Sequence, residues 1–230
     1  MIAVIGATEV MVDIRMGAPE RPEGVDEYGM QTNAEMGSFP TPEERAEEIF
    51  KEGRDRMSIR SCGCGFNIAG SLADEGYEVS FISATGNDIG GIGAAEELRE
   101  RGVDISGVGR FDGVTPVRVT FFNILGDKEM EKKNSLLTEA ITPEYIDKFS
   151  DTLDRAEAIV MDGMIPEETI EHICSRYGER DDVKLFFDPA GKPGSLRAAK
   201  HIGRFHSIMP GREEAETITG KTILSEDQLM

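Results

Sequence analysis

A nine-residue stretch around Asn67, with the sequence CGCGFNIAG at 62–70, holds the residue types best suited to chemistry. A glycine lies on each side of Cys64, and Asn67 follows where apolar residues begin to recur at helical spacing. Cys62 and Cys64 could ligate a metal ion, but such a site needs two further ligands and the sequence shows none close by. The glycine pair could equally form only a tight turn before a helix.

The elements that must position this stretch follow from the hydrophobic pattern. An apolar run at 2–6 indicates a buried strand, and 66–76 carries apolar residues at helical spacing before a glycine end. From residue 76 onward strands and helices alternate, which is typical of a parallel sheet covered by helices. Further strands are predicted at 57–61, 78–86, 105–124 (two strands), 156–163, 183–189 and 205–210, and helices at 41–53, 92–102, 141–153, 166–178, 193–203 and 212–220.

Two segments do not fit this sheet. Residues 12–60 and 107–130 contain hairpin-like runs, and Gly126-Asp127 is a hairpin turn signal. We expect them to form a small β lid within a single domain that covers residues 1–230. The predicted fold class is therefore α/β, with a mostly parallel sheet covered by helices and a small lid.

Length and charge narrow the classes of function. The 230 residues carry 44 acidic and 25 basic side chains, which gives a formal charge of −19 at pH 7. This charge argues against binding to nucleic acid or to a membrane surface, since both need a positive field. No apolar run reaches membrane-spanning length, and three cysteines do not make a disulfide framework. We expect a reduced, soluble, cytoplasmic protein.

Ligands of open α/β sheets bind outside the carboxyl ends of the strands. Asn67 and several acidic residues are expected at that edge, a pattern that indicates a ligand site. Acids at strand ends also serve simply as helix caps, so this alternative stays open. The segments predicted to lie there are 6–13, 63–67, 86–88, 162–166, 188–189 and 210–214.

The order of these motifs resembles the ribokinase-like (PfkB) family of sugar and nucleoside kinases. The resemblance rests on Gly-x-Gly-x-Asn-x-Ala at 63–69, followed by GNDIGG at 86–91, and it covers nearly the whole chain. It implies a three-layer α/β/α fold in which the glycines let the backbone approach a sugar and the asparagine hydrogen-bonds its hydroxyls. Gly63 and Asn67 would then be substrate contacts, and Cys64 a small residue of the pocket wall.

Four other stretches resemble the branch of the family that includes pseudouridine kinases: ITPEYID (141–147), MIPEETIEHI (164–173), LFFDPAGKPG (185–194) and IGRFHSIMPGREEAETITG (202–220). By this resemblance Asp13 matches the family's sugar-binding aspartate by type, at a longer distance from Gly6 than usual. Glu214 matches the glutamate of the family's Asn-x-x-Glu motif, which organises Mg²⁺ and phosphate. Asp188 and Glu214 are thus expected to bind the cofactors ATP and Mg²⁺, with Glu214 as the metal ligand.

The chain departs from the family pattern in three places. Gly211 replaces the asparagine of Asn-x-x-Glu, and Met164 stands where a polar substrate residue is expected. The family's Gly-Ala-Gly-Asp segment, which supplies an anion-binding helix start and the catalytic base, would lie beyond Met230. A capping-box pattern at 225–228 predicts a helix just before that point and so indicates a C-terminally truncated chain; the alternative is a polar tail.

Two functions remain open at this stage. One is ATP-dependent phosphotransfer to a hydroxymethyl group of a pseudouridine-like nucleoside or a sugar. The other is a catalytically incomplete remnant that binds a sugar-like ligand, or only assembles as a homodimer through its lid. We expect no turnover of ATP by the 230-residue chain alone, because the base and its anion hole are expected beyond it. A Rossmann dehydrogenase fits less well, since neither Gly6 nor 63–70 begins a Gly-x-Gly-x-x-Gly run.

Overall fold

The structure, a computed structural model, divides into two compact units. Its described residues are 1–15, 57–123, 127–134 and 136–223. The first unit is assigned Met1–Val10, Ser61–Val117 and Asn134–Met230, and the second Met11–Arg60 and Arg118–Lys133. The helix predicted at 41–53 and the capping-box pattern at 225–228 lie outside the described residues.

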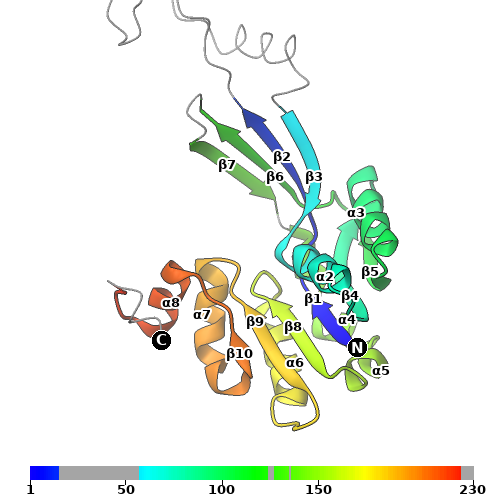
Figure 1. The fold of residues 1–230 in the computed structure, drawn as a ribbon, viewed down its shortest axis with the longest axis vertical. Helices are drawn as coiled ribbons and strands as arrows, with labels where there is room; N and C mark the ends of the chain where they lie inside the picture. The colour runs from blue at the N-terminus through cyan, green and yellow to red at the C-terminus, as the bar shows by residue number, and fades with distance from the viewer. Residues whose placement is uncertain (16–56, 124–126, 135, 224–230) are drawn as a thin grey trace, which may run out of the picture. The chain divides into compact units, whose positions relative to one another are not determined.

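A parallel sheet of six strands forms the centre of the first unit (Figure 1). Its strand order is β10-β9-β8-β1-β4-β5, and every neighbouring pair is parallel. β1 lies between β8 and β4, where a strand buried on both faces needs an unbroken apolar run, and IAVI supplies it. The strands are β1 (Ile2–Ile5), β4 (Val79–Gly86), β5 (Asp104–Phe111), β8 (Ala158–Asp162), β9 (Lys184–Asp188) and β10 (Ser207–Ile208).

Helices pack on both faces of this sheet. Successive side chains of β1 point to opposite faces, so that Ala3 and Ile5 join one apolar cluster and Val4 joins the other. The second cluster also holds side chains from α2 (Cys64–Asp74) and α3 (Ile89–Glu100). The first holds side chains from α4 (Pro143–Asp147), α5 (Ser150–Asp154), α6 (Glu167–Tyr177) and α7 (Lys192–His201). The three-layer α/β fold with a parallel sheet, as predicted from the sequence, is confirmed.

Capping residues decide where several helices begin. Thr142 accepts a hydrogen bond from the N–H of Tyr145 at 3.2 Å, as its place before Pro143 predicts. α3 begins at Ile89 rather than at 92, because Asp88 is its cap. The described residues also form the 3₁₀ turns η1 (Leu136–Ala140) and η2 (Ile202–Arg204) and the helix α8 (Arg212–Thr219).

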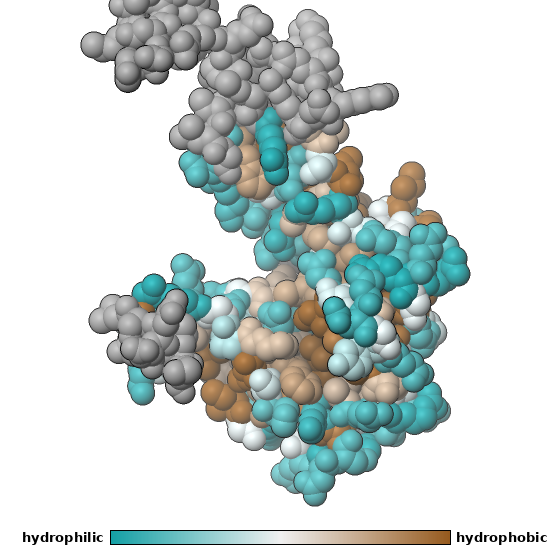
Figure 2. All heavy atoms as spheres, in the orientation of Figure 1, coloured by the Kyte–Doolittle hydropathy of each residue, from teal (hydrophilic) through white to brown (hydrophobic). Residues whose placement is uncertain are grey.

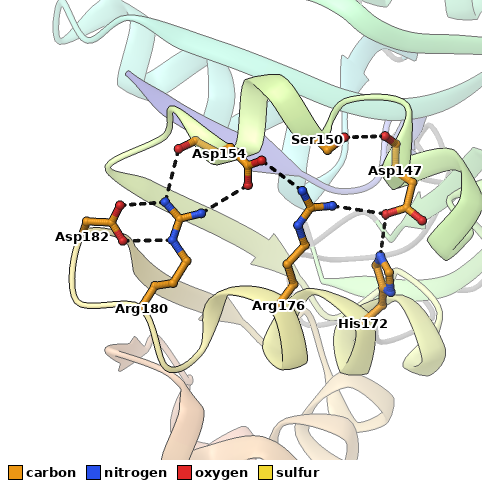
Figure 3. Close-up of polar contacts among 7 residues, drawn as sticks. All are labelled: Asp147, Ser150, Asp154, His172, Arg176, Arg180 and Asp182. Carbon is orange, nitrogen blue, oxygen red and sulfur yellow. Dashed lines mark hydrogen bonds and ion pairs between the residues drawn. The ribbon is translucent and has the colours of Figure 1, made fainter.

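The single helix predicted at 141–153 is wrong, since the structure has two short helices, α4 and α5. At the break the hydroxyl of Ser150 donates to the carbonyl oxygen of Asp147 at 2.8 Å, and such a bond competes with helical backbone pairing. Figure 3 shows ion pairs that hold both pieces against α6: Arg176 lies 3.0 Å from Asp154 and 3.5 Å from Asp147. Tertiary contacts therefore override the continuous helical pattern.

The second unit contains a four-stranded sheet in the order β3-β2-β6-β7. The predicted lid segment 12–60 contributes to this sheet. The prediction that 107–130 also belongs to the lid is wrong for its first residues. Residues 107–111 belong to β5, which pairs with β4 in the main sheet. An alternating pattern cannot distinguish a half-exposed edge strand of a parallel sheet from a hairpin strand. The strands are β2 (Glu9–Arg15), β3 (Met57–Cys62), β6 (Val117–Phe122) and β7 (Lys128–Asn134).

Apolar side chains appear among hydrophilic ones on the surface of the first unit (Figure 2). Ile89 is 91% exposed and Val114 is 62% exposed, and together with Val10 and Val117 they line a shallow hollow. Exposed apolar side chains are usual on folded domains, because polar surface does not suffice to cover them. Of the helices that the structure describes, none is long and apolar enough to cross a membrane.

Candidate functional site

The glycines beside Cys64 bring the start of α2 against the loop after β1. Gly63 has a φ of +117°, and a Cβ there would lie 2.3 Å from the carbonyl oxygen of Ala7. A Cβ on Gly65 would lie 2.7 Å from the Cα of Gly6. These glycines therefore permit the start of α2 to lie close to the backbone of the loop after β1. A contact between Gly63 and a sugar stays a prediction.

Asn67 lies in the first turns of α2, and its side chain is exposed. Its backbone N–H donates to the carbonyl oxygen of Gly63 at 2.9 Å, which begins the helical hydrogen-bond pattern. The side-chain amide makes no hydrogen bond to another residue in the described part of the chain. An amide with free donor and acceptor groups, carried on a helical backbone, is suited to binding ligand hydroxyls.

Asp162 ends β8 next to this helix start and is completely buried. Its Oδ2 accepts hydrogen bonds from the N–H groups of Ala7 at 2.6 Å and Gly65 at 2.9 Å. Its Oδ1 accepts one from the N–H of Met164 at 2.7 Å. Burial raises the pKa of Asp162 to about 6, although these hydrogen bonds act in the opposite direction.

Sequence reasoning placed Asp162 at the right edge of the sheet but did not nominate it as a site residue. The available signal was a carboxylate that closes the buried strand AIVMD, where an apolar residue would otherwise be expected. Only the structure shows which N–H groups it accepts from.

Asp188 ends the neighbouring strand β9, in register with Asp162. Its Oδ1 accepts a hydrogen bond from the N–H of Ala190 at 2.9 Å. Burial, followed by the negative charges of Asp162 and Asp188, raises the pKa of Cys64 far above its usual range. Cys64 is thus a neutral thiol at the start of α2.

Glu214 connects the loops that follow β9 and β10. Its carboxylate accepts hydrogen bonds from the N–H groups of Gly191 at 2.5 Å and Gly211 at 2.7 Å. Beside it opens a hollow of about 820 Å³ that includes the first residues of α7 and α8, whose helix dipoles favour anions. The lining residues are Gly191, Lys192, Gly211, Arg212, Glu213, Glu214, Glu216 and Thr217.

Asp188 and Glu214 offer hard oxygen ligands to a divalent cation. The adjacent residues Ala190 and Gly191 each donate to one of them, so a single loop holds both carboxylates. Among the residues that the structure describes, no three His, Cys, Asp or Glu side chains are grouped to hold a metal. Mg²⁺ is commonly bound by only one or two carboxylates together with waters and phosphate oxygens. The residues present therefore fit Mg²⁺ that is accompanied by phosphate.

The GNDIGG motif forms the loop after β4 and the start of α3. Asp88 accepts hydrogen bonds from the N–H of Gly91 at 2.8 Å and from the N–H and hydroxyl of Thr115 at 2.7 and 2.6 Å. Burial opposes ionisation of Asp88, but these hydrogen bonds outweigh it and lower the pKa. The motif thus fastens α3 to the segment that leads into β6.

Asp13 lies in β2, and its carboxylate is buried. Arg60 of β3 pairs with it at 3.1 Å, which gives the charge a partner within the second unit. Gly63 and Asn67 belong to the first unit. The predicted cleft formed by all three residues therefore stays a prediction, whereas Asn67, Asp188 and Glu214 lie in one unit.

Solved structures share this fold. A carbohydrate kinase from Agrobacterium tumefaciens matches with a TM-score of 0.73 and 19% identity, covering 95% of this chain and 63% of that one. The structure of Arabidopsis thaliana ribokinase complexed with ribose and ATP matches with a TM-score of 0.68 and 15% identity, covering 99% of this chain and 65% of that one. The chain therefore has the ribokinase-like α/β fold that these structures share.

The chain belongs to the pfkB family of carbohydrate kinases, whose profile matches residues 42–230. It is similar to the pseudouridine kinase of Escherichia coli (strain K12), with 28% identity over 159 residues, 69% of this chain and 50% of that protein. The chain spans about half the length of the curated relatives it matches. The family resemblance seen in the sequence is confirmed.

Proposed function

We propose that this chain acts in ATP-dependent transfer of a phosphoryl group to a hydroxymethyl group of a pseudouridine-like nucleoside or a sugar. Membership of the pfkB family supports carbohydrate-kinase chemistry, and the similarity to a pseudouridine kinase supports a nucleoside substrate. ATP as the donor is supported by the ribokinase of the same fold whose structure contains ribose and ATP.

One observation carries the proposal: the first turn of α2 contacts a strand end that bears a carboxylate. Gly65 in that turn donates to Asp162 at the end of β8, and Asp188 ends the neighbouring strand β9 in register with Asp162. Asn67 lies two residues beyond Gly65, in the same first turns of α2. Hydroxyls bound by Asn67 and phosphates held near Asp188 would then be neighbours, as in-line phosphoryl transfer requires.

Each group at the site has a task in such a transfer. Asn67 and Gly63 bind and orient the hydroxyls of the acceptor, and a role for Asp13 stays a prediction from the sequence. Asp188 and Glu214 hold Mg²⁺, which when bound neutralises charge on the transferred phosphoryl group. Two cationic side chains and the N-terminal ends of α7 and α8 stabilise the phosphates of ATP in the adjoining hollow. The cationic residues are Lys192 and Arg212.

Titration calorimetry of the purified chain with pseudouridine, uridine, ribose and fructose tests the acceptor site. Asn67→Ala is expected to weaken binding about tenfold or more, because it leaves ligand hydroxyls without a partner. Ser71→Ala is the matched control, since Ser71 is an exposed polar residue one turn further along α2. Equal affinities of the native and Asn67→Ala chains would refute the role of Asn67.

Mass spectrometry after incubation with Mg²⁺, ATP and each acceptor then tests phosphoryl transfer separately from binding. Native chain that binds none of the four compounds contradicts the proposed substrate class. Binding without any phosphorylated product, in the presence of Mg²⁺ and ATP, supports the binding-only alternative for this chain.

We also propose that the chain forms a homodimer through its second sheet. In the described residues β7 is an edge strand whose seven residues are all exposed, and β3 is exposed from Met57 to Arg60. An edge strand presents N–H and C=O groups that can pair with another chain. Light scattering during size-exclusion chromatography should give twice the 25.2 kDa mass of one chain, and a mass of one chain contradicts the proposal.

A further inference from the structure

The start of α2 lacks a cap of its own. The first N–H groups of any helix have no partner within the helix, and Ser, Thr, Asp or Asn at the cap position usually accepts from one of them. The cap residue of α2 is Gly63, which has no side chain and makes no side-chain cap bond. The N–H of Gly65, the second residue of the helix, is instead bonded to Asp162 at 2.9 Å. A residue 97 positions along the chain therefore supplies the cap.

The residues around Asp162 leave room for its hydrogen bond with Gly65 and add further bonds to it. A Cβ on Gly6 would lie 2.4 Å from Oδ2 of Asp162, so only glycine fits there. The same oxygen accepts from the N–H of Ala7, and the carbonyl oxygen of Ala7 accepts from the N–H of Phe66 at 3.1 Å. Asp162, the loop after β1 and the first turn of α2 thus form a closed set of hydrogen bonds.

Asp162 is too deeply buried to contact a substrate. Its side chain has no exposed surface, and both oxygens already accept backbone hydrogen bonds. A buried carboxylate is costly unless several donors stabilise it, so a purely structural residue at the end of an apolar strand would more simply be apolar. Neither catalysis nor core packing therefore explains why a carboxylate stands at position 162.

We propose that Asp162 is a positioning residue of the substrate site: its carboxylate caps α2 from β8 and so determines where Asn67 presents its amide. The inference rests on the proposed function, because it assigns Asp162 to the site at which Asn67 binds the acceptor. Asn67 is two residues beyond Gly65, in the turn that this cap anchors. Loss of the cap would let that turn fray, so that the side-chain amide of Asn67 occupies a wider range of positions. Binding of the acceptor would then weaken although Asn67 itself is unchanged.

The variant Asp162→Asn tests the proposal, since asparagine keeps the shape but replaces one accepting oxygen with an NH₂ group. Hydrogen exchange of the ligand-free chain should become about tenfold faster or more at the N–H groups of Gly65 and Ala7, which lose a charge-assisted bond. The dissociation constant for pseudouridine should rise by a similar factor. Asp104→Asn is the matched control, because Asp104 also accepts from a backbone N–H, that of Ser106 at 3.0 Å, but at the start of β5.

The two readouts separate the possible failures. Unchanged exchange at Gly65 in a folded Asp162→Asn chain overturns the cap, whatever the ligand does. Faster exchange with unchanged pseudouridine affinity overturns the positioning role. If the native chain binds no compound of the panel, the proposed function fails. The assignment of Asp162 to a substrate site then fails with it. The hydrogen-exchange comparison still tests whether Asp162 caps α2.

A measurement on the native chain covers the case in which Asp162→Asn does not fold. The N–H of Gly65 should exchange with solvent at least about tenfold more slowly than that of Glu168, both taken relative to their intrinsic rates. Glu168 is likewise the second residue of a helix, but its cap residue Pro166 makes no side-chain cap bond. Equal exchange rates of these two N–H groups overturn the cap and with it the proposal.

Discussion

The carboxylate of Glu214 accepts a hydrogen bond from the backbone N–H of Gly191 at 2.5 Å, across 23 positions of sequence. The bond joins the first turn of α8 to the loop after β9. That loop also donates to Asp188 through Ala190, so the geometry of both carboxylates depends on it.

Replacing Glu214 by Gln should weaken both the loop and the proposed Mg²⁺ site. The neutral amide accepts more weakly from Gly191 and Gly211, which should lower the free energy of unfolding by about 1–2 kcal/mol. The rise in Tm that Mg²⁺ and ATP together produce in the native chain should shrink markedly. Differential scanning fluorimetry measures both effects, with Glu168→Gln as control, because Glu168 is exposed on α6 and does not line the hollow. An equal thermal shift in the two variants contradicts the assignment of Glu214.

Gly63→Ala should destabilise the chain by at least about 2 kcal/mol. Alanine is strained at a φ of +117°, and its Cβ would meet the backbone oxygen of Ala7 at 2.3 Å. Gly93→Ala is the contrasting control, because Gly93 lies inside α3 with nothing within 4 Å of an added Cβ. This control should raise the free energy of unfolding by about 0.5–1 kcal/mol. Urea unfolding compares the two, and a Gly63→Ala chain as stable as the native one shows that the contact with Ala7 is not tight.

The unfolding free energy should carry a pH-dependent contribution from Asp162. Its pKa is raised from 3.8 to about 6 by burial, so between these values the folded chain binds more protons than the unfolded chain. The contribution of Asp162 to stability is therefore fully present below pH 4 and is lost as the pH rises through about 6. The stability difference between the native chain and Asp162→Asn should fall between pH 4 and 6 and stay constant above pH 7. A difference that grows with pH over that range would show that the hydrogen bonds outweigh burial.

Cys64 should react slowly with iodoacetamide at pH 8, even though it is only half-buried. Burial and the neighbouring carboxylates raise its pKa, and the thiolate is the reactive form. Asp188→Asn removes one of these negative charges and should make alkylation of Cys64 several times faster. Asp182→Asn, at an exposed ion pair with Arg180, is the control and should change nothing. Mass spectrometry of tryptic peptides gives the rates, and equal rates in both variants would place Asp188 away from the thiol.

Much of the first unit could be predicted because its signals are local. A buried strand such as β1 shows an unbroken apolar run, and α6 follows from its helical spacing of apolar residues. Errors arose where distant contacts compete with such patterns. The two pieces α4 and α5 are held by ion pairs of Arg176 from α6, and β5 joins the main sheet through pairing with β4.

The sequence by itself indicated the family, most of the strands and helices in their order, and the edge of the sheet at which one loop joins Asp188 and Glu214. This was possible because strand ends and glycine-rich helix starts can each be recognised from a few consecutive residues. Only the tertiary structure decided what the glycines at 63 and 65 are close to, namely the backbone after β1. It alone showed that Asp162 caps α2, because a hydrogen bond between residues 97 positions apart depends on how the strands are ordered in space.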